Sequence, residues 1–284
     1  MARAPAPQQR SRLAVNVGHA LDAVQFKKAI VDISDGWCAR ALWATMGAHE
    51  IRQRYRRSVI GPFWITISMG VMVAALGFLY GRIFRLELHD YLPYLAAGFV
   101  TWGFISGLVN DGAQTFIARE HLIRQLSAPL SIYAYRSVWT NLITFAHNVW
   151  IYIIVAAWFG ALPGWIGFLA LPGLLVLVLS GLWLALLLGL LSARFRDIPL
   201  MIASVMQVMF FITPVIWKVS MLPGRAFLLE FNPFWHLMEL IRAPLLGHLP
   251  PMESWVVVAG ITLVGWSVTL LLYTGYRWRI PYWV

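Results

Sequence analysis

The sequence predicts an all-α integral membrane protein. Of its 284 residues, 60% are hydrophobic and only 12% are charged, a balance that would give a water-soluble chain of this size an insoluble surface. The apolar residues gather in stretches of about twenty or more, the length that an α-helix needs to cross a hydrocarbon core about 30 Å thick. The single cysteine, Cys38, excludes an intrachain disulfide and a thiolate metal cluster.

The hydropathy pattern predicts six transmembrane helices within a transmembrane domain of residues 59–284. Each central stretch lacks charge, as insertion requires, because a charged side chain there costs about 2.5–3.5 kcal/mol. The six predicted spans are residues 61–80, 91–109, 131–159, 165–191, 198–217 and 254–273.

Lysine and arginine predict the orientation of these spans, since basic residues beside membrane helices stay on the cytoplasmic side. With both termini in the cytoplasm, seventeen Lys and Arg residues lie on that side and five lie on the other. The inverted orientation would reverse the ratio, so the amino and carboxyl termini are both predicted to be cytoplasmic. The net charge of +10 is then explained by topology and anionic headgroups rather than by nucleic acid.

Two regions precede the first span. Residues 1–33 begin basic and rich in Pro and Gln, lack the continuous apolar core of a signal peptide, and are predicted to be a cytoplasmic tail. Residues 34–58 are predicted to hold an amphipathic interface helix, capped by Ser34 or Asp35 and lying in the membrane plane. Four arginines near its end are candidates for contact with headgroups: Arg52, Arg54, Arg56 and Arg57.

The segment between the fifth and sixth spans, residues 218–251, is too apolar for a plain loop. Two short helices broken at Asn232 and Pro233 are predicted to form a hairpin that re-enters the outer leaflet. Non-spanning backbone is tolerated at that depth only where it packs against protein or lines a wet cavity. Within this hairpin Glu239 and Arg242 are predicted to pair, because residues at i and i+3 of a helix are neighbours.

The sequence contains no ATP-binding loop of the GxxxxGK[ST] type. It has no Gly-Lys dipeptide, and its only lysines are Lys27, Lys28 and Lys218. If ATP drives this protein, a separate chain must bind ATP and Mg²⁺ and hydrolyse the nucleotide. The chain itself is predicted to be a transport subunit without a cofactor, a metal site or a catalytic residue.

The loop between the second and third spans is predicted to contain a short amphipathic helix. Such a helix at the mouth of a bundle can dock in a groove of a soluble partner, or it can contact only lipid. The residues of this segment are Arg119, Glu120, His121, Leu122, Ile123 and Arg124.

Polar residues inside the third span are functional candidates, because ionisable groups are rare within membranes. His147 and Asn148 lie midway along this span. The favoured interpretation is a neutral His147 that hydrogen-bonds to a neighbouring helix. No intramembrane Asp or Glu accompanies it, which argues against a proton-coupled carrier or an ion-coupled flippase. At the cytoplasmic boundary, Asp197 is predicted to pair with Arg194 or Arg196.

Two further sets of side chains have both a functional and a structural interpretation. A catalytic pair among the outer carboxylates would indicate a membrane glycosyl enzyme, but solvated charges explain them better: Glu87, Asp90, Glu230, Glu239 and Glu253. Aromatic side chains near the span ends could stack on sugar rings along a translocation path, or could form lipid-facing belts. The candidates for the path are Phe78, Tyr80, Phe99, Trp102, Phe210 and Phe211.

The motif RYRRSVIGPFW at residues 54–64 resembles the permease subunits of bacterial ABC-2 exporters, and most of all those for O-antigen and related cell-surface polysaccharides. The match runs from about residue 40 to the carboxyl terminus and leaves the tail before it uncovered. Further pieces follow in the same order: YLAAGFVTWGFIS, FAHN, SARFRDIP, ITPVIW and NPFWHLMELIRAPLLG.

The resemblance implies a homodimer in the bacterial inner membrane that works with two copies of an ABC ATPase subunit. It implies export of undecaprenyl-diphosphate-linked polysaccharide through a channel at the dimer interface, partly lined by aromatic residues. It also implies that the segment from Arg119 to Arg124 is the coupling helix that contacts the ATPase, and that residues 218–247 are the outer re-entrant helices. The alternative within the family is another substrate, such as teichoic acid, capsule or a drug.

Overall fold

The computed structural model describes residues 24–54, 56, 58–61, 63–221 and 227–284, and this part of the chain is helical without a strand. Five of its helices are long and apolar enough to cross a membrane. They are α3 (Phe63–Ile83), α4 (Leu88–Ala113), α6 (Ser131–Trp158), α7 (Ala170–Arg194), which follows the 3₁₀-helix η2 (Gly164–Leu169), and α11 (Met252–Tyr276). These five helices correspond to the first four predicted spans and the last.

The fifth predicted span, residues 198–217, is helical only over α8 (Ile198–Ile212). Its 15 residues give a length of about 22 Å, shorter than the hydrocarbon core. The helix ends because Pro214 disfavours helical backbone in the residue before it, and Thr213 is extended with φ −79° and ψ 136°. Five helices of spanning length therefore replace the predicted six, and a sixth crossing stays a prediction.

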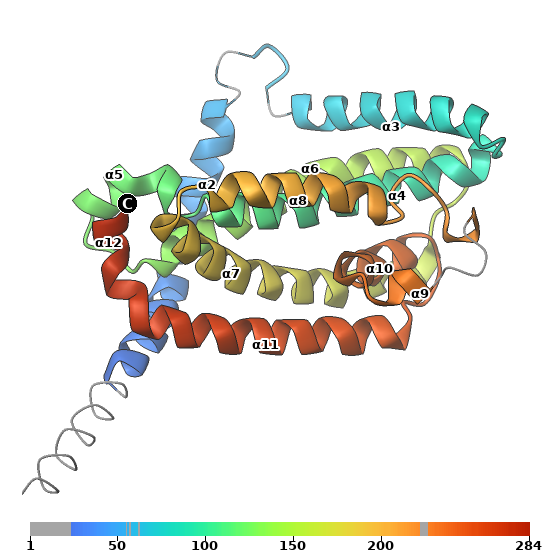
Figure 1. Ribbon diagram of the computed structural model, residues 1–284. Helices are drawn as coiled ribbons and strands as arrows, with labels where there is room; N and C mark the ends of the chain where they lie inside the picture. The colour runs from blue at the N-terminus through green and yellow to red at the C-terminus, as the bar shows by residue number, and fades with distance from the viewer. Residues whose placement is uncertain (1–23, 55, 57, 62, 222–226) are drawn as a thin grey trace, which may run out of the picture.

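Helix α4 is the centre of the bundle and contacts α3, α6, α7, α8 and α10 (Pro233–Leu245). In Figure 1 the long helices run side by side, and α10 lies at one end of them. Close packing around α4 depends on small residues such as Gly107, where a Cβ would lie 2.0 Å from Oδ1 of Asn141 on α6. The bundle thus packs around α4.

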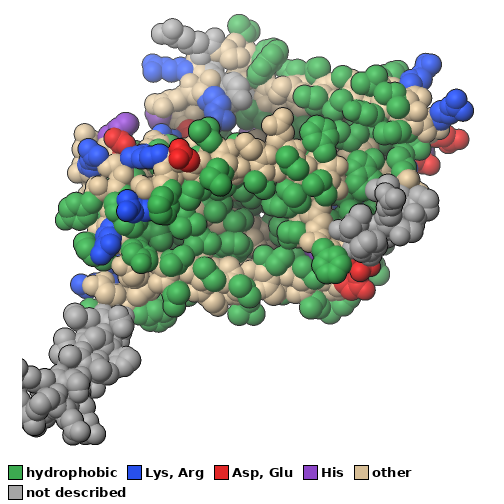
Figure 2. Space-filling view, in the orientation of Figure 1, with side chains coloured by type: hydrophobic (Ala, Val, Ile, Leu, Met, Phe, Trp, Pro, Cys, Tyr) green, Lys and Arg blue, Asp and Glu red, His purple; other side chains and the backbone are tan. Residues whose placement is uncertain are grey.

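The two ends of the bundle differ from its middle. At one end, here called the basic end, lie α2 (Arg40–Arg54), α5 (Glu120–Gln125) and α12 (Ile280–Trp283). Figure 2 shows hydrophobic side chains covering the middle of the visible face, with charged side chains gathered toward both ends. An apolar band between two charged ends is the surface that a bilayer requires.

The region before α2 is more ordered than the sequence predicts. Residues 24–38 form a helix, and a turn at Ala39 separates it from α2. Ser34 and Asp35 therefore lie inside a helix, and the prediction that they cap the interface helix is wrong. The helix was missed because its buried face carries Ala29, Asp32 and Gly36, whereas an amphipathic pattern requires large apolar residues on that face.

Asp32 fastens this helix to the bundle. Its carboxylate accepts hydrogen bonds from the backbone N–H groups of Leu130 (2.9 Å) and Ser131 (3.2 Å) at the start of α6. The Tyr273 hydroxyl of α11 donates to the same carboxylate at 2.6 Å, and the Arg277 guanidinium lies 3.5 Å away. Asp32 thus caps α6 from another helix, and the carboxylate suits the positive end of the helix dipole.

The region between α8 and α11 contains the 3₁₀-helix η3 (Val219–Met221), α9 (Phe227–Glu230) and α10. The predicted break at Asn232 and Pro233 is present, and the Asn232 side chain accepts from the N–H groups of Phe234 (3.0 Å) and Trp235 (3.4 Å). Helix α10 packs on α4, α7 and α11. Entry of this hairpin into the outer leaflet stays a prediction.

The predicted pair of Glu239 and Arg242 is confirmed and is buried. Arg242 is 2% exposed, and its guanidinium donates to Glu239, to the Tyr94 hydroxyl (3.0 Å) and to the Pro214 carbonyl. The Tyr91 hydroxyl donates to the Ile216 carbonyl at 2.7 Å. These bonds hold the chain after α8 against α4 and α10, and they make Glu239 an ion-pair partner rather than a free carboxylate.

Candidate functional site

A groove of about 700 Å³ runs between α4 and α8. Toward the basic end its α4 wall is polar and contains Asn110, Asp111 and Gln114. Farther along α4 the wall becomes aromatic at Trp102. Gln207 adds an exposed amide from α8. Amides, a carboxylate and aromatic faces together can both hydrogen-bond and stack, which is the chemistry that a sugar chain requires.

Three of the six aromatic residues predicted to line the path line this groove, namely Trp102, Phe210 and Phe211, and Phe99 packs on Phe210 beside it. The rings of Phe99 and Phe210 are 5.6 Å apart, and those of Trp102 and Phe210 are 5.8 Å apart. Phe211 adjoins Phe210 at 5.2 Å and is 62% exposed. The cluster joins α4 to α8 by edge-to-face and tilted contacts, which are the favourable geometries for aromatic pairs.

The other two predicted aromatics lie elsewhere. Phe78 on α3 is 59% exposed on the surface, and Tyr80 stacks on Phe84 with ring centroids 5.4 Å apart. Neither lines the groove. Both belong to α3, which packs on α4 and α6 without contributing to the groove, and their role stays a prediction.

The polar residues of the groove were not among the predicted path residues. A signal existed in the sequence: Phe99, Ser106, Asn110 and Gln114 recur at intervals of seven, four and four residues, which places them on one helix face. Gln207 is a second signal, because an amide is unusual in an apolar run such as α8.

A second candidate site lies at the basic end and is centred on Glu50 of α2. Its carboxylate forms an ion pair with Arg119 at 2.8 Å and accepts a hydrogen bond from Arg136 of α6, which is 6% exposed. Arg54, one turn farther along α2, lies 3.9 Å from the same carboxylate. The Nε of Arg136 is buried and, among the described residues, has no hydrogen-bond partner. Charge-assisted bonds of this kind are stronger than neutral ones, so Glu50 ties three segments together.

An open cleft of about 500 Å³ surrounds this carboxylate. Its lining comes from α2, the segment before and within α5, and α6. The lining residues are Met46, His49, Glu50, Gln53, Arg54, Arg119, Leu122 and Arg136.

In the predicted coupling segment, Arg119 to Arg124, some side chains contact the bundle and others are exposed. Ile123 is 7% exposed and packs in a core cluster with the start of α6. Arg124 donates to the carbonyl of Val284 (Nε to O, 3.1 Å), and Glu120 lies 3.8 Å from Arg196. His121 is exposed and faces away from the bundle. The segment is therefore fixed to the bundle on one side and free on the other.

The four arginines predicted at the end of the interface helix do not act as one group. Arg52, Arg54 and Arg56 are exposed, and only Arg54 reaches the Glu50 carboxylate. Arg57 lies outside the described residues. Exposed guanidinium groups at this end are free to meet headgroups or a partner chain.

Two predictions about single polar residues are wrong in their partners. The Nδ1 of His147 donates to the Ile143 carbonyl one turn earlier in its own helix (2.8 Å), not to a neighbouring helix. Arg196 pairs with Glu120 rather than with Asp197, because the α7–α8 turn lies beside α5 at the basic end.

Among the described residues, no group of three His, Cys, Asp or Glu side chains could hold a metal ion.

A bundle of apolar helices with a polar and aromatic groove between two of them, and a charged cluster at one end, defines a membrane transport protein. The chain belongs to the ABC-2 type transporter family, whose membrane domain matches residues 41–246. This range contains both the groove and the Glu50 cluster.

The curated relatives are permeases of one export system. The chain is 24% identical over 229 residues to the O-antigen export system permease protein RfbA of Myxococcus xanthus. The matched region covers 79% of this chain and 88% of that protein. Two proteins of the same name from Klebsiella pneumoniae are 19% and 20% identical over 186 residues, or 65% of this chain and 72% of each relative.

Proposed function

We propose that this chain is the permease subunit of an ATP-driven exporter that moves a lipid-linked polysaccharide of the O-antigen type across the bacterial inner membrane. The observation that carries the proposal is the groove between α4 and α8. Its amide and carboxylate groups can exchange hydrogen bonds with sugar hydroxyls, and its aromatic rings can stack on the apolar faces of sugar rings. The named relatives, which are O-antigen export permeases, support the same substrate class.

A polymer also needs an open path, because no closed pocket could enclose it. The groove is open along α8, whose outer face exposes Leu200, Val208 and Phe211. A second copy of the chain packed against this face would close two such grooves into one channel. The proposed assembly is therefore a homodimer of permeases, with the groove at or beside its seam.

The energy would come from two copies of a separate ATPase subunit at the basic end. The basic end faces the cytoplasm in the orientation that the lysine and arginine distribution favours. The outward face of the segment from Arg119 to Arg124, with His121, offers a contact surface. Movement of this segment would reach α2 and α6 through Glu50, because Arg119 and Arg136 bind the same carboxylate.

The groove is tested by the double variant Gln114→Leu/Gln207→Leu, expressed in a strain that lacks the natural permease gene. Both side chains line the groove and are exposed, so the change leaves the bundle core intact. A net hydrogen bond contributes about 0.5–1.5 kcal/mol, so loss of two predicts a fall in surface polysaccharide of roughly tenfold. The measurement is the amount of surface polysaccharide normalised to permease in the membrane.

The matched control is Ser267→Leu, which replaces an exposed polar residue of α11 outside both the groove and the proposed dimer face. It should export as the unmodified protein does. Equal export by the double variant and this control, at equal membrane levels, would show that the groove does not carry the glycan.

A further inference from the structure

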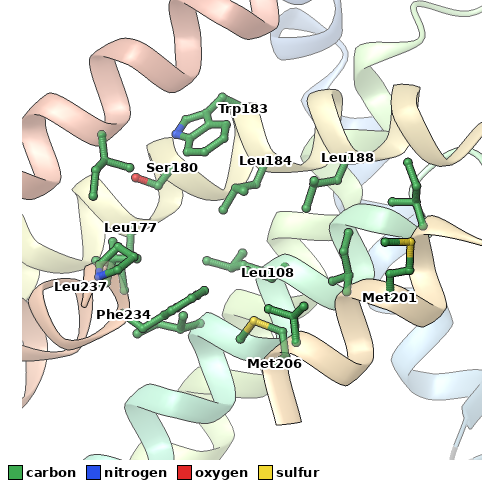
Figure 3. Close-up of a pocket in the computed structure, with 17 residues that line it drawn as sticks. Leu108, Leu177, Ser180, Trp183, Leu184, Leu188, Met201, Met206, Phe234 and Leu237 are labelled. Carbon is green, nitrogen blue, oxygen red and sulfur yellow. The ribbon is translucent and has the colours of Figure 1, made fainter. Parts of the chain in front are cut away.

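A second cavity lies on the other side of α8 from the groove. It has a volume of about 450 Å³ and is lined by residues of α4, α7, α8, α10 and α11. Figure 3 shows Leu184 and Leu188 directed from α7 toward Leu108 of α4, with Met206 on α8 below them. Met206 of α8 lines both the cavity and the groove, so α8 is the wall between the two spaces.

The walls of this cavity are apolar. Its lining contains one hydroxyl, that of Ser180, which hydrogen-bonds to the Thr262 hydroxyl at 2.8 Å. The indole N–H of Trp183 is buried without a hydrogen-bond partner among the described residues. Water needs two to four polar partners to stay in a cavity, and an apolar cavity of about 150 Å³ in another protein stays dry and takes up benzene. Neither water nor a sugar suits a space lined in this way.

The cavity is open toward the membrane. Met201 and Val205 line it from α8 and are 64% and 56% exposed. The surrounding segments of α4, α7 and α11 belong to helices of membrane-spanning length. Hydrocarbon chains are thus the molecules that surround the opening, and an unfilled apolar space destabilises a protein in proportion to its volume.

We propose that this cavity is a binding site for one hydrocarbon chain of a membrane lipid. Such a chain would replace the missing packing between α7 and α8 and so hold α8 in place as a wall of the groove. Its source is either an acyl chain of a bilayer phospholipid or the isoprenoid chain of a lipid-linked glycan. The proposal depends on the membrane position of the helices and not on polysaccharide export, so it can fail while the proposed function holds.

The test fills the cavity and counts bound lipid. The full-length chain, the variant Leu184→Trp and the control Leu263→Trp are purified in mild detergent and examined by native mass spectrometry. Leu263 lies on α11, is 71% exposed and is not part of the cavity, so its substitution adds the same indole to the lipid-facing surface. The unmodified protein and the control should retain one lipid per protomer, and Leu184→Trp should lose most of it.

The mass of the retained lipid identifies its source as phospholipid or isoprenoid. A second measurement adds dioleoylphosphatidylglycerol or undecaprenyl phosphate to lipid-depleted protein. The unfolding temperature should rise for the unmodified chain and the control, and should change far less for Leu184→Trp. If Leu184→Trp does not fold, Leu188→Phe fills the same space with a smaller increase in volume. Equal lipid retention and equal thermal response in the filled and control variants would overturn the proposal.

Discussion

Glu50 provides the sharpest test of how the basic end is held together. The variant Glu50→Gln keeps the shape of the side chain but removes the charge that faces Arg119 and Arg136. At the 2.8 Å separation from Arg119, two charges attract by about 6 kcal/mol at an effective dielectric constant of 20. Desolvation of the two charges offsets much of this attraction. The net loss of stability is therefore better judged from the measured cost of removing one partner of a buried ion pair.

Breaking a buried ion pair costs about 3–5 kcal/mol, because the remaining charge is left uncompensated. The Arg136 side chain is 7% exposed, which fits this case, but the Glu50 side chain is 26% exposed and water can partly replace the lost partner. We therefore expect Glu50→Gln to lower the free energy of unfolding by about 2–3 kcal/mol. At about 2–4 °C per kcal/mol for a chain of similar size, the unfolding temperature should fall by roughly 5–10 °C.

The assay is thermal unfolding of the purified permease, followed by intrinsic tryptophan fluorescence. Glu120→Gln is the matched control, because its 3.8 Å contact with Arg196 lies between side chains 38% and 50% exposed, and such surface pairs contribute less than about 1 kcal/mol. The loss of unfolding free energy in the double variant Glu50→Gln/Arg136→Gln should be smaller, by about 1 kcal/mol, than the sum of the losses in the two single variants. A Glu50→Gln unfolding temperature equal to that of the control, or strict additivity in the double variant, would refute the reasoning.

Two other polar clusters give predictions of the same kind. Asp32→Ala should lower the free energy of unfolding by about 2–3 kcal/mol, because it removes the cap of α6 and a buried charge-assisted bond. The control Asp35→Ala, which changes an exposed residue of the same helix, should have little effect. Similar losses of stability from both variants would contradict the capping role of Asp32. Arg242→Met should cost about 3–5 kcal/mol by leaving the 13% exposed side chain of Glu239 without its partner. The control Arg40→Met changes an exposed arginine, and equal unfolding temperatures for these two variants would exclude a structural role for the buried pair.

The transmembrane helices were predictable because membrane insertion depends on length and composition. The third predicted span, residues 131–159, is the helix Ser131–Trp158 in the structure. The fifth span was predicted too long, because its apolar composition continues past the point at which Pro214 ends the helix. Hydropathy thus measures what can enter a membrane, whereas the backbone decides where the helix ends.

The helix of residues 24–38 could not be predicted from hydrophobic periodicity. Its buried side chains are small or charged, and the hydrogen bonds of Asp32 help to hold it against the bundle. The partners of Asp32 are about a hundred and more than two hundred residues away in the chain. No local pattern can identify partners at that separation.

In both candidate sites, the sequence predicted the kind of residue involved, but the residues that meet there depend on tertiary packing. Aromatic content indicated a stacking surface, but only the packing of α4 on α8 placed Trp102, Phe210 and Phe211 in the groove and left Phe78 and Tyr80 outside it. The segment from Arg119 to Arg124 was identifiable by its amphipathic pattern. Its connection to α6 through Glu50 was not.

By itself the sequence determined the class of protein, the position of five long membrane helices and the absence of an ATP-binding loop from this chain. These follow from composition, from the length of apolar runs and from a local motif, all of which are read along the chain. The tertiary structure alone decided which polar groups meet, which face of α8 borders the polar groove and which face borders the apolar cavity. Those features depend on contacts between residues far apart in sequence, and such contacts exist only once the helices have packed.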